Sequence, residues 1–144
     1  MKRSPALANL SRDHHHTLVV AARLRRATRD TAAEARALLL DHWNRECREH
    51  FRQEEELLLP AYAAHADPHH PLVGRVLCEH VAIRALVFEL EREEAPAVEI
   101  LHAAGDALTG HVRLEERQLF PLIEAALPDA ELERLVALLG DEPG

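Results

Sequence analysis

Apolar residues recur every three or four positions along most of the chain, and this spacing places them on one face of an α-helix. No segment keeps the alternation of apolar and polar residues that predicts a β-strand. Proline, glycine and short polar turns divide the pattern into helical segments. We predict four long helices and a short final one, at about residues 5–28, 31–60, 71–94, 96–126 and 127–140.

Residues with known end preferences mark several of these helices. Ser4 followed by Pro5 is typical of an N-cap and the first helical position. Pro60 is expected to end or kink the second helix, because proline lacks the backbone N–H. Asp129 is expected to cap the final helix and Gly140 to stop it.

Long amphipathic helices joined by short turns predict an all-α fold. We expect an antiparallel up-down-up-down four-helix bundle with a short C-terminal fifth helix. The length of 144 residues suits one domain with its own core, which we assign to residues 1–144.

Two of the long helices carry the same motif. "HFRQEEELLLP" at residues 50–60 returns as "HVRLEERQLFP" at residues 111–121, with six identities at fixed offsets. The other two long helices each carry an acidic residue followed by histidine, in "RDHHHTLVVAARL" and "CEHVAIRALVFEL". Aligning His14 with His80 keeps the apolar positions of these helices matched, so His14 is favoured as the inward residue and His15 is the alternative.

The spacing of histidine and glutamate in the motif points to metal binding. Residues four apart lie on one helix face, so His50 and Glu54 point the same way, as do His111 and Glu115. Their neighbours on that face are apolar or small, so the carboxylates are expected in the core. An unpaired buried carboxylate costs several kcal/mol, and a cation must compensate it.

Histidines on the facing helices complete a ligand set that can hold two divalent or trivalent cations. Mixed imidazole and carboxylate ligation favours iron or manganese, with zinc as an alternative. We expect Glu55 and Glu116 to flank the site, while Glu46 either orients a ligand or pairs with an arginine in solvent. The candidate metal ligands are His14 (or His15), His50, Glu54, His80, His111 and Glu115.

The remaining histidines and the cysteines are assigned no role in the site. We expect Cys47 and Cys78 to be reduced and to act as small apolar fillers near the level of the site, although a disulfide between them stays open. We expect surface or turn positions for His42, His65, His69, His70 and His102.

Composition excludes several classes of function. The net charge of −8 argues against nucleic-acid binding, which needs clustered lysine and arginine. No stretch resembles a signal peptide, and none approaches the ~20 apolar residues of a membrane span. We therefore expect a cytoplasmic protein that binds neither nucleic acid nor membrane.

Four motifs together resemble the hemerythrin-like family, also called the HHE cation-binding domain. They are "DHH" at 13–15, the two repeated motifs above and "EHVAI" at 79–83, and the resemblance covers about residues 6–127. It implies a four-helix bundle with two iron ions in an oxo- or hydroxo-bridged non-heme centre. It also implies that Glu54 and Glu115 bridge the irons and that the four histidines are terminal ligands.

One departure from the family pattern bears on function. Oxygen-carrying members have a second histidine one turn before the third-helix ligand, where this chain has Val76, and Arg84 stands one turn after His80. The resemblance therefore favours binding or sensing of O2, NO or peroxide over simple oxygen storage. The alternatives are an enzyme that detoxifies nitric oxide or peroxide with an electron-donor protein, and an iron-responsive structural or interaction module.

Overall fold

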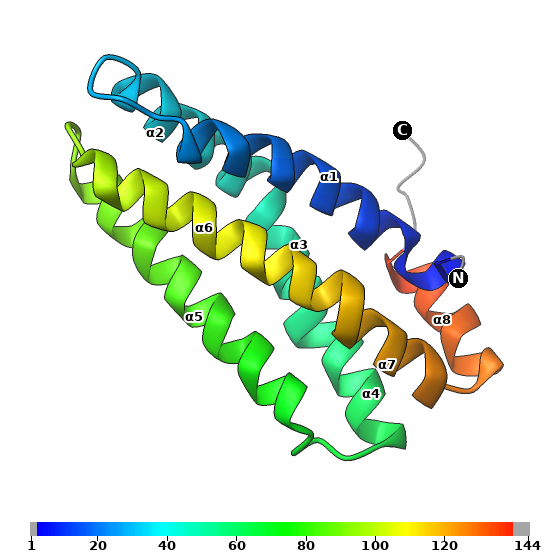
Figure 1. Ribbon diagram of the computed structural model, residues 1–144. Coiled ribbons are helices and arrows are strands. Elements are labelled where there is room, and N and C mark those ends of the chain that lie inside the picture. Colours follow the sequence, from blue (N-terminus) through cyan, green and yellow to red (C-terminus); the bar gives the residue numbers. More distant parts are fainter. Residues whose placement is uncertain (1–2, 140–144) are drawn as a thin grey trace.

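The computed structural model describes residues 3–139, which form helices and no strands. The long helices lie side by side and reverse direction at each turn (Figure 1), so the predicted antiparallel bundle with a short fifth helix is confirmed. The four long helices and the short one are α1 (Pro5–Arg25); α2 (Ala32–His42), η1 (Trp43–Cys47), α3 (Arg48–Gln53), η2 (Glu54–Leu58) and α4 (Leu59–His65); α5 (Pro71–Arg92); α6 (Val98–Leu114), η3 (Glu115–Leu119) and α7 (Phe120–Ala126); and α8 (Asp129–Leu139).

The helix ends follow local sequence in part. Ser4 is the N-cap of α1, where its Oγ accepts a hydrogen bond from the Ala6 N–H at 3.3 Å, and Pro5 opens the helix. Asp129 is the first residue of α8, and the expected stop at Gly140 lies outside the described residues. The second long helix does not end at Pro60 but continues to His65.

Widened π-helical turns explain how proline is accommodated. The turns η2 and η3 each begin at the glutamate of the repeated motif and end two residues before its proline. The Leu59 N–H donates to the Glu54 carbonyl, and the Phe120 N–H donates to the Glu115 carbonyl, in bonds that span five residues. Because a proline ring clashes with the carbonyl four residues earlier, the wider turn lets the helix pass through Pro60 and Pro121.

The apolar core is divided into two clusters. One includes Leu24, Trp43 and Leu108, and the other, toward α8, includes Leu58 and Phe120. Buried polar side chains of the candidate site lie between these clusters along the bundle. The apolar packing on both sides therefore fixes the four helices that carry them.

Helices α1 and α6 pack closely and run together along the bundle (Figure 1). A Cβ added at Gly105 would lie 2.8 Å from the Ala21 carbonyl oxygen and 2.6 Å from Cγ of Arg25, so glycine permits this approach. Among the described residues, no helix combines the length and apolar character that a membrane crossing needs.

Candidate metal centre

Six buried side chains converge from all four long helices. Their ligand atoms form two groups, and within each group the atoms lie within 4.8 Å of one another. One group contains His14 and His50 and the other contains His80 and His111, while Glu54 and Glu115 belong to both. The structure thus brings together the set predicted from the sequence and selects His14, because His15 is exposed.

Helical spacing places the glutamate of each motif beside its own histidine. The distance from His50 Nε2 to Glu54 Oε2 is 3.1 Å, and the distance from His111 Nε2 to Glu115 Oε2 is also 3.1 Å. Each pair spans one helical turn, and the π-helical turn begins at the glutamate. The repeat in sequence is therefore a repeat in geometry.

Contacts between helices join the two halves. His14 Nε2 lies 2.9 Å from Glu115 Oε1, and His80 Nε2 lies 3.0 Å from Glu54 Oε1. Each glutamate therefore faces a histidine from its own helix and one from another helix. This exchange gives the site an approximate twofold symmetry that matches the internal repeat.

A carboxylate holds the outer nitrogen of every histidine in the site. Because an ionised carboxylate can only accept, each Nδ1–H is the donor and each Nε2 faces the centre. The four Nδ1 contacts are His14 to Glu116 at 2.6 Å, His50 to Asp13 at 3.0 Å, His80 to Glu55 at 2.7 Å and His111 to Glu79 at 2.7 Å. Metal-binding histidines typically have this arrangement, which fixes the ring and its tautomer.

The outer carboxylates are anchored in turn. Arg3 lies 3.2 Å from Glu116, and Arg84 lies 3.2 Å from Glu55. Ser11 donates to Glu116 at 2.7 Å. Arg84 also lies over the Trp43 ring, 5.3 Å from its centroid, so the position singled out in the sequence supports the histidine that precedes it by one turn.

Apolar and aromatic side chains enclose the polar groups. Phe51 stacks on the His80 ring with centroids 3.8 Å apart, and Phe120 stacks on His14 at 5.4 Å. Leu10 and Val76, one turn before His14 and His80, are fully buried. Val76, where oxygen-carrying members have a second histidine, is therefore a buried hydrocarbon side chain.

The charges in the site shift the pKa of its members strongly. Burial lowers the pKa of His111, but Glu115 and Glu79 outweigh it and raise this pKa to about 10. Burial also lowers the pKa of His80, but Glu115 and Glu54 outweigh burial and raise this pKa to about 9. Burial raises the pKa of Glu115, but His111 and the other histidines bring it well below its usual range.

Several atoms at the centre form no hydrogen bond of acceptable geometry, although Nε2 of His50 and Nε2 of His80 lie 3.1 and 3.0 Å from the Glu54 carboxylate. They are His50 Nε2, both carboxylate oxygens of Glu54 and Glu115 Oε2. Such buried polar atoms are costly unless a ligand satisfies them. The Nε2 atoms of His80 and His111 are 3.2 Å apart, which fits two nitrogens that each lie ~2.1 Å from one metal ion. The side chains present therefore fit a pair of bound cations.

Three expectations about residues near the site were wrong. His42 is buried, because it lies one turn after the core residue Leu39, and its Nε2 is 2.9 Å from Thr17 Oγ1. Glu46 contacts His42 at 3.3 Å and His16 at 2.9 Å rather than a histidine of the site. Cys78 is exposed and does not fill the core, whereas Cys47 is buried; both thiols are free.

Access to the two halves differs. A groove of about 200 Å³ between α5 and α6 is lined by His111 and Glu79, with Ala82, Ala107 and Gly110 among its walls. The repeat places His16 and Glu46 at the positions that correspond to Ala82 and Ala107, and their side chains contact one another. Small side chains therefore form a groove whose wall includes the buried His111 and its partner Glu79.

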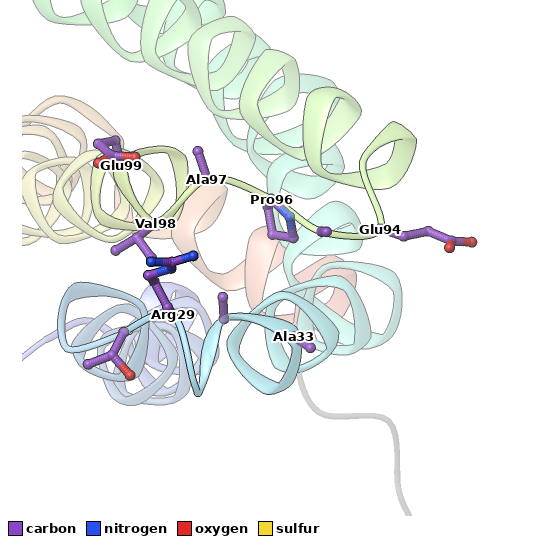
Figure 2. A pocket seen from close by; sticks show the side chains of 10 residues that line it. Arg29, Ala33, Glu94, Pro96, Ala97, Val98 and Glu99 are labelled. Carbon is purple, nitrogen blue, oxygen red and sulfur yellow. The ribbon is translucent and has the colours of Figure 1, made fainter.

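A separate pocket of about 670 Å³ lies at one end of the bundle (Figure 2). It is formed by the turns that precede α2 and α6, and its charged lining residues are Arg29, Glu94 and Glu99. None of the six converging side chains lines this pocket. This pocket is therefore separate from the candidate metal centre.

A family model described as the hemerythrin HHE cation binding domain matches residues 6–123, a span that includes all six converging side chains. Comparisons with curated proteins and with solved structures gave no match. The family match agrees with the helical bundle and with the buried histidine and glutamate groups. The chain therefore belongs to the hemerythrin HHE cation-binding domain family and carries buried side chains suited to a bridged site for two metal ions.

Proposed function

We propose that this domain binds two iron ions and uses them to bind or sense a small ligand such as O2, NO or peroxide. The observation that carries the proposal is the pair of buried groups that share Glu54 and Glu115, with the Nε2 atoms of four histidines facing the same centre. Iron suits this mixture of imidazole and carboxylate ligands, and manganese and zinc are the competing metals.

The number of ligands supports a site that leaves coordination positions on the metal ions free for a small ligand. Each group offers two imidazoles and two shared carboxylates, and Val76 adds none. When bound, the iron ions would supply open coordination positions and one-electron redox chemistry. The protein itself holds the imidazoles through Asp13, Glu55, Glu79 and Glu116, and its apolar walls exclude bulk water.

A purely structural role is the second candidate, and one observation favours it. The unpaired oxygens of Glu54 and Glu115 lie between the two halves of the core, so bound cations would stabilise the fold itself. In this role the domain would respond to iron by folding or docking, without binding a gas.

Spectroscopy on the purified protein separates these roles. Iron, zinc and manganese per chain are measured first, and the iron-loaded protein is then reduced without oxygen and exposed to NO, O2 or peroxide. Saturable changes in visible absorption that are absent from a His80→Ala variant support ligand binding. Sustained peroxide loss at substoichiometric protein, with an electron donor, shows an enzyme instead. Unfolding by a chelator together with a spectrum that no ligand changes supports the structural role and contradicts the first proposal.

A further inference from the structure

The outward face of α5 is apolar over most of its length. Val81 is 68% exposed and Phe88 is 61% exposed. Half of the six large hydrophobic residues described as exposed lie on this one helix: Leu77, Val81 and Phe88. Exposed apolar patches of this kind on a folded domain mark interaction sites.

The exposed residues at the centre of this face follow a heptad spacing. Steps of four and three residues place them in one line along the helix, as in the contact seam of a coiled coil. The seam runs for about 27 Å, from the rise of ~1.5 Å per residue. We define it as Gly74, Cys78, Val81, Ala85, Phe88 and Arg92, all of which are exposed.

We propose that α5 pairs antiparallel with α5 of a second copy of this chain. The sizes of the side chains favour this direction, because small residues then face large ones. Gly74 faces Arg92 of the second copy, Cys78 faces its Phe88, and Val81 faces its Ala85. Alternating small and large residues is the condition for close packing across such a seam.

The charges beside the seam favour the same direction. Antiparallel pairing brings exposed Arg75 next to Glu89 of the second copy, and the twofold symmetry makes this contact twice. Parallel pairing would instead place the acidic C-terminal ends of both α5 helices together, where Glu89, Glu91, Glu93 and Glu94 cluster. It would also place Phe88 against Phe88 and leave a gap between the two Gly74 residues.

Two arginines bring charge to the seam: Arg92 holds its guanidinium 5.5 Å from the centroid of the Phe88 ring, and Arg84 would approach its own copy near the symmetry axis. The Arg84 guanidinium is directed inward, toward Glu55 and over the Trp43 and Phe51 rings. This orientation turns the charge away from the second copy. The pairing surface is therefore the outer side of the same helix whose inner side carries His80.

The molar mass in solution tests the pairing directly. Light scattering or sedimentation of the metal-loaded full chain should give about twice the 16.2 kDa of one chain, with dissociation on dilution. Val81→Glu and Phe88→Glu should each shift the mass to that of one chain while helix content and metal content stay unchanged. Val19→Glu, an exposed valine on α1, is the matched control and should leave the dimer intact. A monomer at every concentration, or equal dissociation by the control, would overturn the proposal.

Disulfide trapping tests the direction. In a Cys78→Ala background, mixing the single variants Val81→Cys and Ala85→Cys should give a crosslinked heterodimer under mild oxidation. The remaining Cys47 is buried, and burial raises its pKa to about 12, so it does not compete. If Val81→Cys crosslinks with itself and the mixture gives no crosslinked heterodimer, the helices pair in parallel, and this result would contradict the proposed arrangement.

Discussion

Metal affinity should depend steeply on pH, because protons compete for the ligand atoms of His80 and His111. Their pKa values are raised to about 9 and about 10, so near neutral pH, in the absence of metal, both rings are imidazolium ions that carry a second proton on Nε2 in addition to the one on Nδ1. A metal ion needs both Nε2 lone pairs, so binding must release two protons from this half of the site. Affinity is therefore expected to rise with pH and to level off near pH 10.

The size of the effect follows from the proton count. Each released proton changes the apparent affinity tenfold per pH unit, so two protons give about 100-fold, or about 2.7 kcal/mol, per pH unit. The pKa values of His14 and His50 are also raised, since Glu115 and their other carboxylate partners outweigh burial, so the complete site should show a slope of at least two.

Competition with a chelator measures this slope. The apparent affinity for Co2+ or Zn2+ is determined from pH 6.5 to 8.5 and corrected for the chelator's own protonation. Calorimetry in buffers with different ionisation enthalpies then counts the released protons independently. A slope near zero, with no proton release, would mean that the histidines are neutral before metal binds, and it would refute the electrostatic argument for the site.

Other consequences concern single side chains and the metal-free protein. His14→Ala should lose metal while His15→Ala keeps it, as elemental analysis will show; the reverse result would exchange their roles. Glu79→Ala should weaken metal binding about 10–100-fold by releasing His111, whereas the exposed Glu89→Ala should not change the chelator titration. In the metal-free protein, the raised histidine pKa values stabilise the folded state below pH 6.5, and this contribution is lost as pH rises through about 9 to 10. The lowered pKa of Glu115 contributes stability above about pH 4.5 that is lost in acid, so denaturant midpoints should peak between these limits, and a flat profile would contradict the assignment.

The sequence predicted the bundle and the six converging side chains because both depend on periodicity within a helix. Residues four apart share a face in any α-helix, so the repeated motif predicted that Glu54 and Glu115 are buried in the core, as the structure has them. Choosing His14 over His15 needed only the match of apolar positions with the helix that carries His80.

Contacts between helices were harder to predict. The pairing of Asp13 with His50 and of Glu79 with His111 depends on the axial register of neighbouring helices, which periodicity does not determine. Arg3 reaches Glu116 from outside the helices, so no spacing rule applies to it. The prolines that follow η2 and η3 are a sequence signal for these two π-helical turns. The π-helical turn η1 has no such proline, and α6 has no π-helical turn at the corresponding position.

The most direct test of the account is the number of metal ions per chain. Two per chain are expected after native purification or anaerobic iron loading, because two groups of ligands share the same pair of carboxylates. Replacing both Glu54 and Glu115 by alanine removes ligands from both groups at once, and the loaded protein should then contain no stoichiometric metal. If that double variant still held two metal ions per chain, the claim that these glutamates join the two metal positions would be contradicted.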